Sequence, residues 1–176
     1  MANLLKVEID RLNLWDREFI LKRNQFLVTR FEVCNHLFYI NEGAVRAFYS
    51  REKDDISIRF GYQGSFITSI TSLLQGIPTD LEISAIRSSK IQSVAREKLL
   101  KAVETDTKMA ETYRLVLESL LTDYIEREQD ILTDSPRERY ERVLLRSPRV
   151  FQEIPHKYIA SYLRMTPETL SRLRNS

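Results

Sequence analysis

The residues best suited to a chemical role lie close to the end of the 176-residue sequence. If the stretch "TPETLSRLR" is helical, Glu168, Ser171 and Arg172 share one face, because they stand at positions i, i+3 and i+4. An arginine on such a face can bind the O6 and N7 atoms of guanine, and a glutamate can accept a hydrogen bond from N4 of cytosine. The spacing therefore indicates a helix that reads the edges of DNA bases.

Two short helices are needed to position this face. The first is expected at about residues 156–163, and a break follows at residues 164–165. Thr166 can then cap the second helix, with Pro167 at its first position. Five small or apolar residues should pack between the two helices: Ile159, Ala160, Leu163, Leu170 and Leu173. This pattern is typical of a helix-turn-helix, whose second helix enters the major groove. A helical hairpin that only caps a domain is the alternative.

The residues on the exposed side of the two helices form the predicted DNA-binding set. We expect side chains of the first helix to hold phosphates, which position the protein, and those of the second helix to contact bases. The set consists of Lys157, Tyr158, Ser161, Thr166, Pro167, Glu168, Thr169, Ser171 and Arg172.

Charge is spread unevenly along the chain. The formal net charge is +2, but residues 133–176 hold nine Lys and Arg against five Asp and Glu, a net of +4. A basic region of this kind is typical of a nucleic-acid partner. A basic face that only contacts solvent is the alternative.

The composition excludes several classes of protein. Hydrophobic residues make up 43% of the chain, enough for a core, and the single Cys34 rules out an internal disulfide. No apolar run reaches the roughly 18 residues of a membrane span, and the first residues lack a signal peptide's apolar stretch. His36 and His156 stand far apart, with no cluster of nucleophilic or metal-ligating residues. We expect a cytoplasmic protein that is not an enzyme and has no metal site and no membrane partner.

The first half of the chain is expected to be rich in strands. The stretch "HLFYINEGAVRAFYS" places two aromatic and β-branched runs around residues 41–43, a hairpin signal in which Gly43 supplies a left-handed position. The stretches "FILKRNQFLV", "DISIRF" and "LEISAIRSSKIQSVA" add further short runs. Several short strands at close spacing favour a sandwich or barrel.

A long helix should follow at residues 107–132, because this segment has no Gly or Pro. A helix of about 25 residues spans roughly 37 Å, more than one small β domain covers along one stripe. We therefore predict a coiled-coil-like dimer interface; a helix packed on its own domain is the alternative. The predicted interface residues are Met109, Tyr113, Val116, Leu117, Leu120 and Tyr124.

The order of these regions resembles the CRP/FNR family of bacterial transcription regulators. The resemblance is carried by "SPRERYERVLLRSPRVFQEIPHKYIASYLRMTPETLSRLR", by "LFYINEGAVRAFY" and by "FGYQGSFI". It implies an α+β fold: a cyclic-nucleotide-binding-like β-roll of the double-stranded β-helix or jelly-roll type at 1–104, a dimerisation helix at 105–132, and a truncated helix-turn-helix domain without a wing at 133–176. The partners it implies are a two-fold-symmetric DNA operator, a second copy of the chain, RNA polymerase and a small-molecule effector.

The predicted ligand pocket differs from that of the family's cyclic AMP-binding members. There, a short helix after Gly-Glu and a later Arg-Ser pair hold the cyclic phosphate, whereas this chain has Ser65 in place of the glutamate and Thr79 and Asp80 in place of the pair. A phosphate needs a cation or clustered N–H donors, and Asp80 has the wrong sign. We expect no cyclic AMP and no bound cofactor, and the pocket either takes another ligand or is vestigial. The pocket residues are Gly64, Ser65, Phe66, Thr79, Asp80 and Thr122.

The sequence therefore predicts a CRP/FNR-type DNA-binding transcriptional regulator that does not respond to cyclic AMP. The alternative is a cyclic-nucleotide-domain-like binding or interaction protein whose helix-turn-helix no longer reads DNA. That alternative is favoured by the expected lack of a wing and by Arg164, which stands at a turn position where the family has glycine. In addition, Pro167 replaces an arginine that many members use on DNA.

Overall fold

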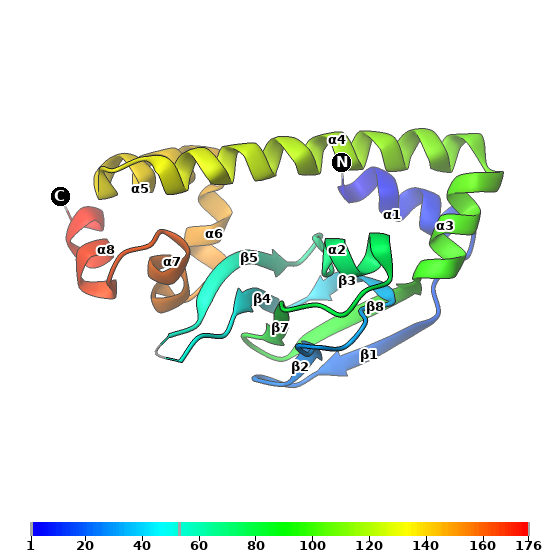
Figure 1. Ribbon diagram of the computed structural model, residues 1–176, viewed down its shortest axis with the longest axis horizontal. Coiled ribbons are helices and arrows are strands. Elements are labelled where there is room, and N and C mark those ends of the chain that lie inside the picture. Colours follow the sequence, from blue (N-terminus) through cyan, green and yellow to red (C-terminus); the bar gives the residue numbers. More distant parts are fainter. Residues whose placement is uncertain (1, 53, 176) are drawn as a thin grey trace.

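The computed structural model describes residues 2–52 and 54–175 of the chain. The strands are β1 (Arg17–Leu21), β2 (Phe26–Val28), β3 (His36–Glu42), β4 (Ala44–Tyr49), β5 (Ile56–Tyr62), β6 (Phe66–Ile67), β7 (Glu82–Ala85) and β8 (Ser89–Ala95). The helices are α1 (Ala2–Arg11), α2 (Ile70–Gln75), α3 (Arg96–Thr105), α4 (Thr107–Leu132), α5 (Pro136–Arg146), α6 (Pro148–Glu153), α7 (His156–Tyr162) and α8 (Pro167–Arg174). The strands form a β-roll, and α4 runs along it to the short helices at the C-terminal end (Figure 1). The predicted mixed fold of β-roll, long helix and helix-turn-helix is confirmed.

Two antiparallel sheets with the strand orders β1-β8-β3-β6 and β2-β7-β4-β5 make up the β-roll. Gly43 joins β3 to β4 with a φ of 96°, and a Cβ atom there would lie 2.2 Å from Oγ of Ser89, so the turn requires glycine. Because β3 and β4 belong to different sheets, the prediction of a hairpin around residues 41–43 is wrong. The turn instead carries the chain from one sheet to the other, which encloses a core between them.

Capping residues set where the helices of the second half begin. Oδ1 of Asp106 accepts a hydrogen bond from the N–H of Met109 at 2.8 Å, and α4 starts at the next residue after this cap. Oγ of Ser135 accepts from the N–H of Glu138 at 3.3 Å, and Pro136 occupies the first position of α5. A side-chain cap therefore precedes the first residue of both α4 and α5.

The first half of α4 packs on its own chain. Met109 has no exposed surface and lies in one apolar cluster with Leu5 of α1 and Leu99 of α3. Tyr113 and Val116 pack against the same cluster. Met109 therefore has no surface left for the predicted dimer interface, whereas Tyr113 and Val116 are half-buried and stay predictions.

The second half of α4 presents an apolar stripe to solvent. Leu121 is 62% exposed and Leu132 is 74% exposed, and Ile125 lies between them on the same face. Leu117 and Leu120 of the predicted interface are half-buried, whereas its Tyr124 is 47% exposed beside Ile125. Despite these apolar residues, the described helices include none with the length and apolar character to cross a bilayer.

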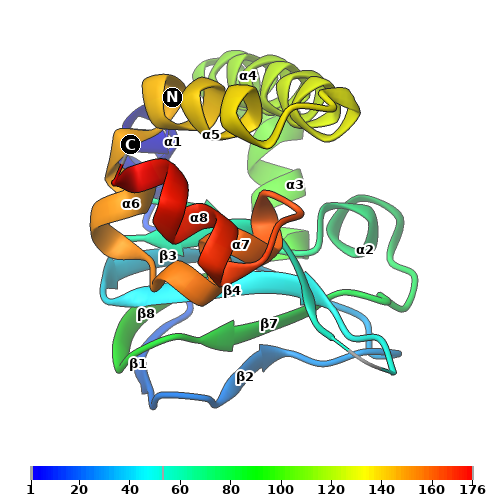
Figure 2. The same ribbon diagram turned by 90° about the vertical axis from the view of Figure 1, so that its left-hand side faces the viewer.

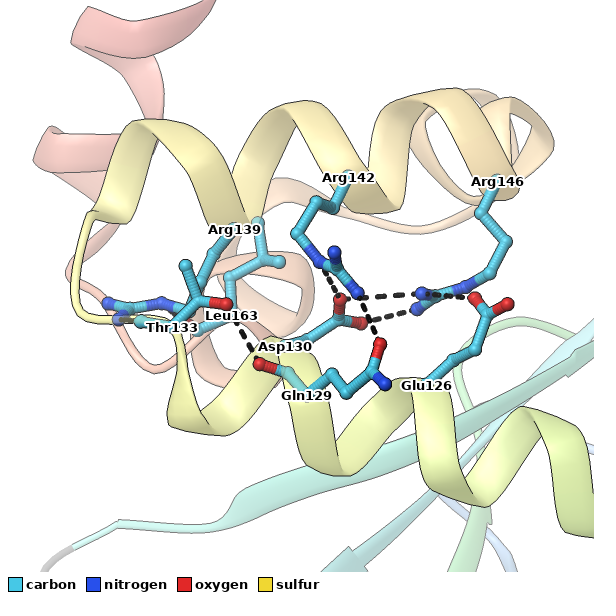
Figure 3. Close-up of polar contacts among 8 residues, drawn as sticks. All are labelled: Glu126, Gln129, Asp130, Thr133, Arg139, Arg142, Arg146 and Leu163. Atoms are coloured by element: carbon cyan, nitrogen blue, oxygen red, sulfur yellow. Dashed lines mark hydrogen bonds and ion pairs between the residues drawn. The ribbon is translucent and has the colours of Figure 1, made fainter.

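A buried carboxylate joins α4 to α5 (Figure 3). The side chain of Asp130 has no exposed surface; it forms ion pairs with Arg142, Nε to Oδ1 at 3.1 Å, and with Arg146. Arg146 also pairs with Glu126 at 2.8 Å, and Arg142 donates to the side-chain oxygen of Gln129 at 3.1 Å. A buried carboxylate is stable only when its oxygens are paired in this way, so the network fixes the angle between the two helices.

Replacing Asp130 by alanine should destabilise the protein by about 1–3 kcal/mol. Arg142 and Arg146 keep some solvent contact, which limits the cost of losing their shared partner. Urea unfolding measures the change, and Glu128→Ala on the exposed side of α4 is the control. Equal stabilities of the two variants would show that the network does not stabilise the fold.

Candidate nucleic-acid interface

Two helices joined by a tight turn, α7 and α8, form the candidate site. Arg164 stands in the turn, where glycine is expected from the family resemblance, and its φ of 57° is a left-handed conformation that is costly for a residue other than glycine. The N–H of Met165 donates to the carbonyl oxygen of Ala160 at 3.0 Å, which closes the turn despite this cost. The backbone therefore has the expected helix-turn-helix geometry.

The inner faces of the two helices are packed against each other. Ile159, Ala160, Leu163 and Leu170 have no exposed surface. They belong to an apolar cluster that also includes Ala44 at the start of β4. The core of the helix-turn-helix is therefore continuous with the surface of the β-roll.

The start of α8 is organised by a side-chain cap. Oγ1 of Thr166 accepts a hydrogen bond from the N–H of Thr169 at 3.2 Å, and Pro167 follows the cap. The pKa of Glu168 lies below its ordinary value, because its own backbone N–H and then the Thr166 hydroxyl stabilise the carboxylate, with a further contribution from Arg172. Glu168 is therefore ionised at neutral pH and can only accept hydrogen bonds.

The outer face of α8 is open to solvent. Glu168, Ser171 and Arg172 are all exposed, and Thr169 beside them is half-buried. In Figure 2 the molecule is seen from its C-terminal end, and α8 lies at the front with no element covering it. The structure thus brings together the predicted base-reading residues on one accessible helix face.

The outer face of α7 is placed differently from the prediction. Oγ of Ser161 donates to the carbonyl oxygen of Asp55 at 2.9 Å and accepts from the N–H of Ser57 at 3.0 Å. The prediction of a phosphate contact by Ser161 is therefore wrong for this arrangement, because both of its hydrogen bonds are made within the chain. The ring of Tyr158 is also in contact, 4.5 Å from the guanidinium carbon of Arg46, whereas Lys157 is exposed.

One residue that sequence reasoning missed ties the turn to the long helix. Arg139 of α5 donates from Nε to the carbonyl oxygen of Leu163 at 3.0 Å, at the end of α7. Its Nη1 donates to the carbonyl oxygens of Thr133 and Asp134, which follow α4. The carbonyl groups at two helix ends are thus satisfied by one guanidinium. In the sequence, Arg139 is only one of several arginines in a basic helix, and nothing there distinguishes it.

Two of the predicted ligand-pocket residues use their hydroxyls within the chain. Thr79 is buried, and its hydroxyl is bonded to Oγ of Ser69 at 2.8 Å and to the N–H of Leu81 at 3.0 Å. Thr122 is exposed on α4 and donates to a carbonyl oxygen of its own helix. These hydroxyls are used within the chain rather than directed at a common ligand.

Two other pocket residues, Ser65 and Phe66, have partners within the chain. Oγ of Ser65 accepts from the N–H of Tyr62 at 3.3 Å, next to Gly64 with a φ of 90°. The ring of Phe66 packs 4.9 Å from that of Tyr39, centroid to centroid. Asp80 is exposed and brings a negative charge to this segment.

A β-roll, a long helix and a helix-turn-helix in this order define the architecture of CRP/FNR-family transcription regulators. The structure is similar to that of FixK2 from Bradyrhizobium japonicum, with a TM-score of 0.79, 21% identity, and coverage of 90% of this chain and 82% of FixK2. It is also similar to a CooA variant from Carboxydothermus hydrogenoformans, with a TM-score of 0.73, 18% identity, and coverage of 94% of this chain and 77% of CooA. The Thermus thermophilus catabolite activator protein is similar as well, with a TM-score of 0.59, 18% identity, and coverage of 96% of this chain and 81% of that protein. No protein-family model and no curated protein matches the sequence. The chain has the fold of the CRP/FNR-family regulators.

Proposed function

We propose that the protein is a homodimeric, DNA-binding transcriptional regulator of the CRP/FNR type. The observation that carries the proposal is the exposed outer face of α8, with Glu168, Ser171 and Arg172 side by side on a capped helix. An arginine and an ionised glutamate on one such face can distinguish guanine and cytosine in the major groove. The fold shared with FixK2, CooA and the catabolite activator protein supports this reading.

Contacts to the phosphate backbone would come from the start of each helix. Lys157 is exposed in the first turn of α7, where its ammonium group can approach a phosphate. Thr166 is exposed at the start of α8, where its hydroxyl can donate to a phosphate oxygen, and Pro167 is exposed beside it. Such contacts hold the recognition helix in register without reading sequence.

The second copy of the chain would cover the exposed stripe of α4. Leu121, Ile125 and Leu132 lie on one face of a helix whose opposite face is packed on α1 and α3. Two such stripes packed together remove these leucines and isoleucines from water. A two-fold axis along this contact would present two copies of α8 to one DNA duplex. RNA polymerase is the further partner that we expect at a promoter.

Fluorescence anisotropy with a labelled promoter-length duplex tests the proposal. We expect the logarithm of the association constant to fall linearly as the logarithm of the salt concentration rises, because bound Lys and Arg release counterions from the phosphates. Binding that is absent at low salt, or that does not change with salt, would instead favour an interaction protein whose helix-turn-helix reads no DNA.

Cyclic AMP should not bind this β-roll with appreciable affinity. Thr79 uses its hydroxyl internally, and the exposed Asp80 next to it repels a phosphate. Ser65 also uses its hydroxyl internally, and none of the three is the cation that a cyclic phosphate requires. Isothermal titration calorimetry with cyclic AMP should therefore show no binding heat, and a micromolar dissociation constant would refute this view of the segment.

A further inference from the structure

The edge of the second sheet is where the helix-turn-helix meets the β-roll. β5 is the last strand in the order β2-β7-β4-β5, so one of its sides has no neighbouring strand. An edge strand offers unpaired N–H and C=O groups to whatever lies beside it. Here the hydroxyl of Ser161 in α7 bonds to one group of each kind: it accepts a hydrogen bond from the N–H of Ser57 and donates one to the carbonyl oxygen of Asp55.

The same aspartate is tied to a second contact with α7. The side chain of Asp55 forms an ion pair with Arg46 of β4 and accepts a hydrogen bond from Ser50 at 3.2 Å. The guanidinium carbon of Arg46 lies 3.8 Å from the ring centroid of Phe48 and 4.5 Å from that of Tyr158. Arg46 is thus held in place within the β-roll while it stacks on the first helix of the helix-turn-helix.

Contacts between α7 and the long helix are less directional. The guanidinium of Arg127 in α4 lies 3.8 Å from the ring of Tyr162, and its buried nitrogens have no hydrogen-bond partner among the described residues. The ring of Phe60 in β5 packs 5.5 Å from that of Tyr162. Ring contacts tolerate rotation and sliding, whereas the two hydrogen bonds of Ser161 have strict geometric requirements. The position of α7 is therefore set by hydrogen bonds at two places: Arg139 holds its C-terminal end from α5, and Ser161 holds its outer face from the β-roll.

We propose that Arg46, Asp55 and Ser161 form an orientation lock that fixes the direction of α8 relative to α4. These residues contact no DNA; they are positioning residues, and their effect on DNA binding rests on the proposed function. The lock occupies the outer face of α7 and leaves the outer face of α8 open, so it holds the helix-turn-helix without covering its reading surface.

The lock matters in a dimer because both half-sites must be engaged at once. Two recognition helices reach successive major grooves only when they are about 34 Å apart and correctly rotated. If each helix-turn-helix turns freely, few arrangements satisfy both grooves, and the advantage of binding two half-sites together falls. A lock between α7 and β5 therefore makes the dimer selective for one half-site spacing.

Hydrogen exchange of the DNA-free protein tests whether the lock exists. In Ser161→Ala the amide of Ser57 loses its acceptor, and we expect it to exchange about tenfold faster than in the wild type. Ser147→Ala removes a hydroxyl from the same group of helices, outside the lock, and should leave the Ser57 amide unchanged. Equal exchange of Ser57 in Ser161→Ala and the wild type would overturn the proposal.

A spacing series tests what the lock does. A two-half-site duplex is first selected from random sequences with the wild-type protein, and its half-sites are then moved apart in steps of one base pair. We measure the affinity of these duplexes for the wild type, for Ser161→Ala and for Arg46→Met. We expect a sharp optimum for the wild type, a flattened profile for both variants, and unchanged affinity for a single half-site. A variant that keeps the wild-type profile would overturn the proposal. If the wild type binds no duplex, the proposed function fails, and the exchange result alone then decides whether the lock exists.

Discussion

Replacing Leu121 and Ile125 together by glutamate should convert the dimer into a folded monomer. Both side chains are exposed on the stripe of α4 that a second copy would cover. Burial of a leucine or isoleucine contributes about 1.5–3 kcal/mol. Leu121 and Ile125 are 62% and 49% exposed, so about half of this value remains to be gained, and four side chains per dimer amount to at least about 3 kcal/mol, or roughly 10²-fold in the dissociation constant. Light scattering at tens of micromolar protein should then show the monomer mass.

The control for this experiment is Ser119→Glu, which adds a charge to the same helix on a different side from the stripe. It should remain a dimer, and circular dichroism should show the same helix content in all three proteins. The structure changes the choice of residues: Leu117 and Leu120, which the apolar period favours, are half-buried in the protomer. A wild-type protein that is already a monomer at this concentration would contradict the dimer.

Arg172→Ala should weaken binding to the preferred site and relax its specificity at one base position. The lost contact, two hydrogen bonds to a guanine, is worth about 1–3 kcal/mol in each half-site. A symmetric site contains two of them, so the dimer should lose at least tenfold in affinity. Competition with duplexes changed at single positions measures both effects.

The matched control is Arg174→Ala, which removes the same charge from the same helix. Arg174 is two residues further along α8 and lies on a different side from Glu168 and Arg172. It should reduce affinity for all duplexes slightly and leave the base preference intact. If Arg172→Ala and Arg174→Ala behave alike, Arg172 contributes only charge and does not read a base.

The helix boundaries near the C-terminus could be predicted because their signals are local. A Ser or Thr cap, a proline at the first position and an apolar inner face are contained within about ten residues, and the structure shows all of them for α5 and α8. The break between α7 and α8 could be predicted too, because Thr166 and Pro167 mark the start of a new helix.

The sequence predictions that were wrong concern residues whose contacts are made with residues far away in the chain. An apolar period shows that α4 has a buried face, but it does not show that α1, a hundred residues earlier, covers Met109. Similarly, Ser161 stands on the polar side of α7, and its hydrogen-bond partner is 104 residues away in β5. Gly43 predicts a turn, but it does not show which sheet the next strand, β4, joins. That depends on the pairing of β4 with β5 and β7.

Selection of duplexes from a random-sequence pool by the wild-type protein is the most direct test of the account. The account predicts enrichment of one two-fold-symmetric site whose half-site centres are about 10–10.5 base pairs apart, one turn of the double helix. Enrichment of no sequence, or of a single site without symmetry, would contradict a dimeric protein that reads DNA through the outer face of α8.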